Sequence, residues 1–385
     1  MTQSRRWLLT DVETGTHLEH FQLSQADLPE MPGTWSVSKQ TLRGGLSDGV
    51  ERVTIDNGAL KFHVLPTRGM GLWKGEFRGT FLGWKAPVAG PVHPKFVNLA
   101  DRNGLGWLAG FDELLCRCGL VSNGPPGADQ GTPLTLHGRI ANLPAHRLEL
   151  AIDPAPPHAI SLSGVVDEGG LFLGRLRLTT TYSTELNSNR LTIHDVVENL
   201  SAKPAEMQIL YHLNLGAPLL QAGSAIAVPF RELAPHTPHA AQALGSFDSY
   251  GGPVAGFAEE VFDFVPAGGA DGRTLALLRN AVGTLGLAVR WNVRELPCFT
   301  VWKNTAAFED GYVTGLEPGT NFPYFKSHER ERGRVKLLPP GGRWEARWSM
   351  EVVDTSASVT ALAAEVAGLQ RSVKPTIRRS PAFGP

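Results

Sequence analysis

Three side chains capable of acid–base chemistry stand far apart in the sequence. Glu317 lies in the segment Thr-Gly-Leu-Glu-Pro-Gly-Thr-Asn-Phe-Pro, His212 in Tyr-His-Leu-Asn-Leu-Gly, and His137 in Leu-His-Gly-Arg. A carboxylate and an imidazole can together remove and donate a proton near neutral pH. These residue types therefore indicate an acid–base enzyme that acts on a small, neutral substrate.

All three are expected where a β-strand ends. Glu317 follows the β-type run 311–316, and the Pro-Gly pair after it is typical of a turn. Gly, Pro or Asn also stands near His137 and His212, and loops on a rigid β scaffold often carry catalytic groups. A single Glu at a turn is more often a solvated charge, and a strand His more often a packing residue. The shared setting is what favours a functional role.

Short runs of alternating apolar and polar residues predict the strands that would position these groups. Val53–Ile55 and Leu60–Val64 flank Asp-Asn-Gly and are typical of a hairpin. Further predicted strands cover residues 171–173, 176–182, 191–197, 207–211, 274–278, 285–289, 298–302 and 344–352. Turn residues separate the runs, which predicts an all-β protein, a large antiparallel β-sandwich with few short helices.

Two helices are expected. Apolar residues at helical spacing run from Val359 to Leu369, with Ser356 and Ser358 as possible N-caps, and a shorter helix is predicted over 105–115. No internal repeat or change in composition divides the chain. We therefore expect one carbohydrate-active domain over 1–370, with 1–45 packed on it as an N-terminal extension, and a flexible, basic tail over 371–385.

Composition narrows the choice of partners and location. Lys and Arg number 36 and Asp and Glu 37, and no basic stripe with interleaved aromatic residues suggests nucleic acid. The 9 Trp and 17 Phe residues suit a sugar ligand, because aromatic rings can stack on the faces of sugar rings.

Cys116, Cys118 and Cys298 form neither a disulfide pattern nor a zinc motif. With no secretory signal and no apolar run of about 18 residues, the expectation is a soluble cytoplasmic protein without a membrane partner. The oligomeric state stays open.

The motifs, taken together, resemble the aldose 1-epimerase (galactose mutarotase-like) superfamily. The resemblance rests on Arg-Gly-Met at 68–70, His-Gly at 137–138, His-x-Asn-Leu at 212–215 and Leu-Glu-Pro…Asn-Phe-Pro at 316–323, in matching order and rough spacing. A bacterial branch of aldose-1-epimerase-like proteins also has the Gly-Phe-Asp-x-Leu-Leu…Cys-Gly-Leu segment found at 110–120 and the Trp-Lys pair at 302–303.

The resemblance implies a β-supersandwich with a sugar cleft on its concave face and no metal or cofactor. In the family, a Glu removes the proton of the anomeric hydroxyl and a His protonates the ring oxygen; the ring opens, the C1–C2 bond rotates and the ring closes as the other anomer. By motif match the base is Glu317 and the acid is His212. The substrate-binding residues that the motifs place on the sugar are Arg68, His137, Asn214 and Asn321.

This sequence departs from the well-characterised mutarotases in some details. Its His-Gly and His-x-Asn segments are shorter, and the sugar-binding aspartate has no clean counterpart. Possible substitutes are Asp248, Glu260 and Asp263, of which Glu260 is preferred. Asp112, Arg117 and Lys303 are expected either to be additions to the pocket or to form structural ion pairs. Extra Arg and Lys in the pocket would favour a sugar acid or a sulfonated or phosphorylated sugar.

Three functions remain open on the sequence. The leading prediction is a sugar mutarotase. The second is a keto-sugar epimerase or lyase that uses the same acid–base pair, with a divalent metal held by His137, His212 and Glu317 as one possibility. The third is a carbohydrate sensor without catalysis, against which the retention of both the acid and the base argues.

Overall fold

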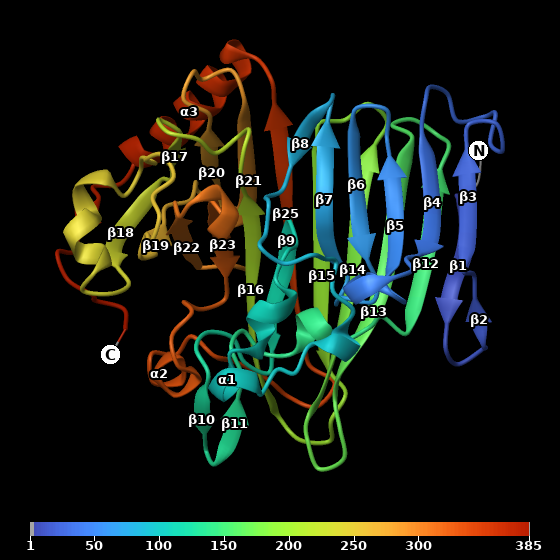
Figure 1. Cartoon of the computed structure of the whole chain (residues 1–385), viewed down its shortest axis with the longest axis horizontal. Helices are drawn as coiled ribbons and strands as arrows, with labels where there is room; N and C mark the ends of the chain where they lie inside the picture. The colour runs from blue at the N-terminus through green and yellow to red at the C-terminus, as the bar shows by residue number, and fades with distance from the viewer. Residues whose placement is uncertain (1–3, 385) are drawn as a thin grey trace.

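Two large β-sheets lie face to face in the computed structural model, which describes residues 4–384 (Figure 1). Neighbouring strands are antiparallel except for one short parallel pair at an edge. The predicted all-β sandwich is therefore confirmed, and we call its layers the smaller and the larger sheet.

Within residues 4–384, the smaller sheet has ten strands. Their spatial order is β17 (Ala225–Ala227), β20 (Arg273–Arg279), β21 (Gly286–Asn292), β25 (Arg343–Val353), β15 (Arg190–Asn199), β14 (Arg175–Glu185), β13 (Ala159–Gly169), β12 (Arg147–Asp153), β1 (Arg5–Asp11) and β2 (Thr16–His17).

Over the same residues, the larger sheet has fourteen strands. Along its main path these are β26 (Thr376–Ile377), β18 (Phe230–Pro235), β19 (Glu260–Pro266), β22 (Cys298–Asn304), β23 (Val313–Gly319), β16 (Ala205–Leu215), β9 (Leu115–Leu120), β7 (Gly71–Phe77), β6 (Leu60–Leu65), β5 (Glu51–Asp56), β4 (Ser36–Thr41) and β3 (His20–Ser24). β24 (Lys336–Leu338) pairs with β16 and β8 (Thr80–Leu82) with β7, while β10 (Gly127–Asp129) and β11 (Thr132–Leu134) form a separate hairpin.

Helical segments are short apart from α3 (Ser356–Arg371). The others are α1 (Asp101–Gly104), α2 (Lys326–Glu331) and the 3-10 turns η1 (Gly45–Ser47), η2 (Pro94–Phe96), η3 (Gly106–Gly110), η4 (Ile140–Asn142), η5 (Ala240–Ser246) and η6 (Phe308–Asp310). α3 is the predicted C-terminal helix, although Thr355, rather than Ser356 or Ser358, is its N-cap and accepts a hydrogen bond from the Ser358 N–H.

Two local expectations differ from the structure. Residues 171–173 form an exposed turn between β13 and β14 instead of a strand, because glycines flank a run of only three apolar residues. The helix predicted over 105–115 is limited to the short η3, because residues 111–114 after it have no regular structure and residue 115 already begins β9.

The ends of the chain are held by the sheets. β1 pairs with β12 and β26 pairs with β18, so residues at both ends extend the two layers. The ring of Phe383 stacks on Phe322 with centroids 4.8 Å apart. Both β26 and Phe383 belong to the segment 371–385, which is predicted to be a flexible tail. Its flexibility stays a prediction.

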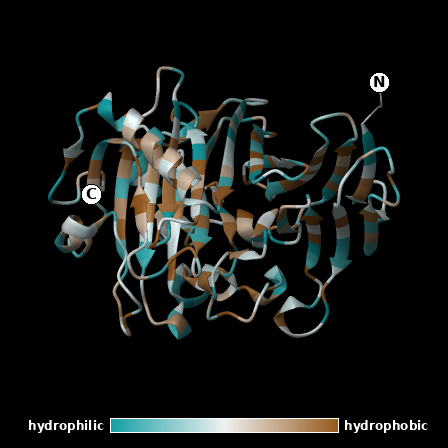
Figure 2. Cartoon of the chain, turned by 90° about the horizontal axis from the view of Figure 1, so that it is seen from above, coloured by the Kyte–Doolittle hydropathy of each residue, from teal (hydrophilic) through white to brown (hydrophobic). Residues whose placement is uncertain are grey.

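Hydrophobic and hydrophilic residues alternate along strands of the sandwich (Figure 2). Successive side chains of a strand point to opposite faces of its sheet. On β16, Ile209, Tyr211 and Leu213 point into the core between the sheets. Leu210 belongs to a second buried cluster on the opposite face. That cluster comprises Trp84, Trp107, Phe111, Cys116, Cys118, Ala141, Leu210 and Val313. The larger sheet is thus covered on its outer face as well, by the chain around η3 and η4.

Candidate active site

A row of polar side chains crosses this outer face of the larger sheet. Asp263 on β19 is paired in register with Thr300 on β22, and Thr300 with Glu317 on β23. His212 on β16 follows next, because its neighbour Leu213 is opposite Leu316. Residues directly opposite one another on adjacent strands share a face of the sheet. The register of the four strands therefore brings these side chains into one row.

His212 and Glu317 are in contact at the centre of the row. The His212 Nε2 and Glu317 Oε1 atoms are 3.2 Å apart, and the side chains are only 7% and 3% exposed. The sequence predicts Glu317 at the end of a strand, but β23 continues through Pro318 and Gly319. The ladder to β16 is interrupted between Leu213 and Leu210, opposite Pro318, which has no N–H to donate. The pair thus lies where the backbone pairing opens.

Asn214 fixes the tautomer of His212. The Asn214 side-chain amide donates hydrogen bonds of 3.0 Å to the carbonyl oxygens of Glu113 and His212, which leaves its Oδ1 as an acceptor. That Oδ1 is 2.6 Å from His212 Nδ1, so Nδ1 carries the hydrogen. In the neutral imidazole the lone pair is then on Nε2, facing Glu317.

Burial sets the protonation of the pair. It raises the pKa of Glu317 well above its usual range, with Asp263 and Glu259 adding to the effect. Burial also lowers the pKa of His212 to about 4. The hydrogen bond with Asn214 raises this pKa, but by less than burial lowers it. Both changes disfavour the charged form. At neutral pH the pair therefore holds one proton, which lies on Glu317 when the imidazole is neutral.

Gly315 provides the space that the pair occupies. A Cβ atom at this position would lie 2.4 Å from Glu317 Oε1 and 3.1 Å from His212 Cε1. Any larger residue would therefore displace one of the two groups. The sequence motif Thr-Gly-Leu-Glu contains this glycine, but the sequence shows no reason for it.

The pair lies at a cavity of about 350 Å³ with apolar walls. The lining residues are Leu105, Trp107, Leu108, Phe111, Gly124, Pro125, Leu136, His137, His212, His236, Thr237, Glu259, Val261, Trp302, Glu317 and Pro323. The ring centroids of Phe111 and Trp302 are 5.1 and 5.4 Å from that of His212. Aromatic walls beside a few converging polar groups are suited to binding a sugar ring.

His137 reaches the cavity from a loop. Its φ is 56°, and its backbone N–H and carbonyl are bonded to Gly124 and Gly119. Its ring is 5.6 Å from that of His212, and Nδ1 has no hydrogen-bond partner among the described residues. Burial, helped by His212, lowers the pKa of His137 to about 3. His137 is thus a neutral imidazole available to a ligand.

Arg68 lies outside the cavity and holds its wall in place. It is buried, with Nε 2.5 Å from Glu113 Oε1, and its guanidinium also donates to the carbonyls of Val92 and Gly110 and to Asn142 Oδ1. The Glu113 carbonyl in turn accepts from Asn214. Arg68 therefore orders the segment that supports His212, with all of these donors engaged by the protein.

Arg117 faces the opposite way from the predicted pocket. On β9, Cys116 and Cys118 belong to the outer cluster, so the residue between them points into the core. There Arg117 forms a two-point ion pair with Asp195 of β15, at 2.5 and 2.9 Å. It joins the two sheets and does not reach the cavity.

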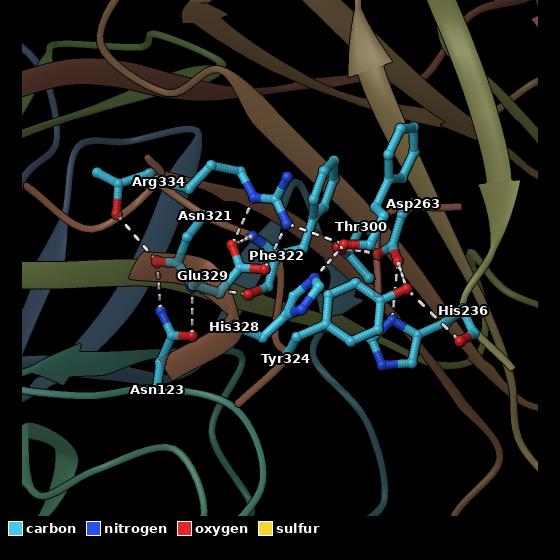
Figure 3. Close-up of polar contacts among 12 residues, drawn as sticks. Asn123, His236, Asp263, Thr300, Asn321, Phe322, Tyr324, His328, Glu329 and Arg334 are labelled. Carbon is cyan, nitrogen blue, oxygen red and sulfur yellow. Dashed lines mark hydrogen bonds and ion pairs between the residues drawn. The ribbon is translucent and has the colours of Figure 1, made fainter. Parts of the chain in front are cut away.

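The remaining predicted residues lie beside the cavity without lining it. Lys303 Nζ is 3.2 Å from Glu260 and donates to the carbonyl of Ser246, so that Glu259, not Glu260, reaches the cavity wall. Asp112 accepts a hydrogen bond from Trp73 Nε1, and burial and Glu113 raise its pKa to about 7. Asn321 is paired through its amide with Asn123 (Figure 3).

Sequence reasoning did not find His236, Glu259 or Trp107, which also line the cavity. His236 stands in Ala-Pro-His-Thr-Pro and has no neighbouring motif. Its place becomes evident only when β18 pairs with β19. Trp302 lies within the noted Trp-Lys pair, and its Nε1 donates to Glu259 Oε2 at 2.6 Å.

Residues 4–384 provide neither a metal-binding cluster nor a helix that could span a membrane. That range contains no group of three or more His, Cys, Asp or Glu side chains suited to a metal ion, and the trio His137, His212 and Glu317 forms none. None of the helices in the described part combines the length and apolar character that a membrane crossing requires.

Residues 47–352 match the family model described as "Domain of unknown function (DUF4432)". The chain belongs to this family. A crystal structure of a protein from Klebsiella pneumoniae subsp. pneumoniae MGH 78578, named a "putative aldose 1-epimerase", is 34% identical to this chain with a TM-score of 0.96. The match covers 98% of this chain and 99% of that one.

More distant structures share the fold. A galactose mutarotase-like protein from Clostridium acetobutylicum has a TM-score of 0.57 at 13% identity, covering 88% of this chain and 99% of that one. A galactose 1-epimerase from Lactobacillus acidophilus NCFM has a TM-score of 0.53 at 15% identity, covering 82% and 98%. The comparison with curated proteins found no match. The predicted resemblance to the aldose 1-epimerase (galactose mutarotase-like) superfamily is confirmed.

Proposed function

We propose that the protein is a sugar mutarotase, an isomerase that interconverts the anomers of an aldose. The observation that carries the proposal is the contact of 3.2 Å between His212 Nε2 and Glu317 Oε1 beside an aromatic-walled cavity. Anomer exchange requires one proton to leave the anomeric hydroxyl and one to reach the ring oxygen. A carboxylate and an imidazole on adjacent strands can exchange protons with the anomeric hydroxyl and the ring oxygen, which are both bonded to C1.

The proton balance of the pair fits this reaction. Transfer of its proton across the contact gives an ionised Glu317 and a protonated His212. Glu317 then takes the proton of the anomeric hydroxyl while the C1–O5 bond breaks, C1 becomes a carbonyl carbon, and His212 delivers its proton to O5. After rotation about C1–C2, the reverse steps on the other face of the carbonyl close the ring. The pair carries one proton before and after each step.

The charges around the cavity support a neutral sugar. Glu259 and Glu317 line it, and no Arg or Lys does so in the part of the chain that the structure describes. Arg117 and Lys303, which could have bound an anionic sugar, are engaged with Asp195 and with Glu260. A sugar carboxylate or phosphate would meet two protein carboxyl groups and neither an Arg nor a Lys side chain.

Saturation-transfer NMR across a panel of sugars tests the reaction and the charge preference together. Glucose and glucuronic acid form a matched pair, because they share the anomeric centre and differ in charge. We expect exchange to accelerate for one or more neutral aldoses and much less for the corresponding acids. Sugar binding without acceleration would indicate a sensor, and conversion of a keto-sugar without anomer exchange would indicate the epimerase or lyase alternative.

A further inference from the structure

A second imidazole–carboxylate pair lies at the other end of the polar row. His236 follows β18, and its Nδ1 is 2.8 Å from Oδ2 of Asp263, which is completely buried on β19 (Figure 3). Asp263 also accepts hydrogen bonds of 2.8 Å from the hydroxyl groups of Thr300 and Tyr324. Three donors thus converge on one carboxylate, whose oxygens accept the hydrogen bonds. His236 Nδ1 therefore carries the hydrogen that Asp263 accepts.

The other edge of the His236 ring is available to a ligand. His236 lines the cavity with Thr237 and Val261, and its Nε2 makes no hydrogen bond to any residue within 4–384. The ring is stacked on Tyr324, with centroids 4.0 Å apart and planes inclined by 5°. Asp263 behind it and Tyr324 beside it thus fix the orientation of the imidazole. An aromatic face also favours a cation next to it.

The spacing of the row suits a sugar between the two pairs. Glu317 and Asp263 are two strands apart, with Thr300 between them in register. Adjacent strands are about 4.8 Å apart, which places the two backbones roughly 10 Å from each other. The Thr300 hydroxyl donates to Asp263, so it separates the two carboxyl groups. A ring bound over Thr300 could reach Glu317 at one end and His236 at the other.

The charges around His236 distinguish it from the other imidazoles of the cavity. Burial lowers the pKa of His236, but Asp263 on β19, Glu259 before β19 and Glu329 of α2 together raise it more, so the net direction is upward. Glu329 is itself paired with Arg334, at 2.6 Å. Burial instead lowers the pKa of both His137 and His212. Among the imidazoles of this cavity, His236 is thus the one whose surroundings favour the protonated form.

We propose that His236 is a charged hydrogen-bond donor for the sugar, which holds a substrate oxygen on the wall across from Glu317, and that Asp263 is the residue that positions it. The proposal rests on the proposed function in taking a sugar as the ligand. His236 forms no covalent bond to the sugar and does not transfer its proton. Its role is to hold the sugar so that the anomeric carbon lies over Glu317 and His212. The preferred substrate would then present a hydroxyl group at the end remote from C1.

Imidazole NMR of the intact protein tests the first half of this proposal. The His236 signal, assigned by its loss in His236→Gln, should titrate above pH 6.5 in the wild type and at lower pH in Asp263→Asn, because the countercharge is gone. Glucose or galactose should shift it. A wild-type titration below pH 6.5, an unchanged titration in Asp263→Asn, or no response to any sugar in the panel would overturn the proposal.

Kinetics test the second half. Loss of a hydrogen bond from a charged donor should lower kcat/KM for anomer exchange about 10- to 100-fold in His236→Gln, mostly through KM. His239→Gln is the matched control, since His239 lies three residues further on, is exposed and does not line the cavity. Equal kinetics in the two variants would overturn the role of His236 while anomer exchange by the wild type stands. If the wild type accelerates no sugar, the proposed function fails, and the sugar response of the His236 signal still decides this inference.

Discussion

At the scale of single residues, the site depends on two groups that are both kept from their charged forms. Glu317 and His212 are buried, and isolated charges in such a place would cost several kcal/mol. Sharing one proton avoids that cost. A hydroxyl of the substrate, with one donor and two acceptor sites, can complete the hydrogen bonding of both groups as the charges form. The uncharged pair is therefore suited to hydrogen bonding with a neutral, hydroxyl-rich ligand.

Replacement of Gly315 by Ala should disturb the pair without disturbing the sheet. The new Cβ would lie 2.4 Å from Glu317 Oε1, so the carboxyl group has to turn away from His212. We expect anomer exchange to fall about 10- to 100-fold, because misplacement of a reacting group by about 1 Å can cost that much. Gly245→Ala is the control, since nothing lies within 4 Å of its added Cβ. Full activity in Gly315→Ala would show that the observed position of Glu317 is not the catalytic one.

The pair also predicts an acid limit to activity. His212 has a pKa of about 4, and when it is protonated next to a protonated Glu317 the pair has no base. Exchange should thus be nearly constant from neutral pH to about 5 and fall as the pH approaches 4. The measurement is kcat/KM against pH, with tryptophan fluorescence to show that the protein remains folded. A loss of activity already complete at pH 6 would contradict this assignment.

At the scale of elements, strand alternation decides which residues reach the cavity. His212 and Glu317 could be paired from the sequence because their motifs match the family. For Arg117 the sequence predicts either a place in the pocket or a structural ion pair. It falls between Cys116 and Cys118, points into the core and forms the ion pair with Asp195. The alternation of β9 is present in the sequence, yet the sequence does not show which face carries the site.

Other parts of the site could not be predicted from local sequence at all. The contact of His236 with Asp263 depends on the pairing of β18 with β19, and the position of His137 depends on a loop fixed by Gly119 and Gly124. Both are long-range backbone contacts. The predicted hairpin of β5 and β6 and the helix α3 did appear, because their turn residues and apolar spacing are local signals.

The hairpin of β5 and β6 gives a prediction on stability. His63 on β6 has a pKa of about 4, lowered by burial and then by Arg52, Lys61 and Lys74. Its folded pKa lies below the unfolded value of about 6.5, so stability is present above pH 6.5 and is lost as the pH falls towards 4. His63→Gln should therefore gain on the order of 2 kcal/mol relative to wild type between pH 7.5 and 4.5.

Urea unfolding at the two pH values provides the measurement for His63→Gln. Anomer exchange at pH 7.5 serves as its control and should not change, because His63 does not line the cavity. A constant difference in unfolding free energy between the variant and the wild type at both pH values would show that His63 is protonated as freely in the folded protein as in the unfolded chain.

At the scale of the whole molecule, the two sheets form a rigid support for a site on the outer face of one of them. The core between the sheets holds the strands in register, while the chain around η3 and η4 builds the walls of the cavity. The ion pair of Arg117 with Asp195 links the layers directly behind His212, because Arg117 is in register with Tyr211.

Arg117→Met should therefore reduce stability and leave sugar recognition unchanged. It would strand the charge of Asp195 in the core, at a cost of about 3–5 kcal/mol in unfolding free energy. Adding Asp195→Asn removes that charge and should restore part of the loss. Urea denaturation of the single and double variants gives the stability, and KM at a temperature where both are folded gives the recognition. An unchanged stability together with a raised KM would return Arg117 to the substrate-binding residues.

The most direct test of the central claim is the anomer-exchange rate of wild type and Glu317→Gln on the sugar that the wild type accelerates most. Glutamine keeps the shape of the side chain but can neither take nor hold the proton. The proposed mechanism predicts a fall of about 10²–10⁴-fold, with the folded structure retained. Exchange at the wild-type rate in Glu317→Gln would contradict the assignment of this pair as the catalytic centre.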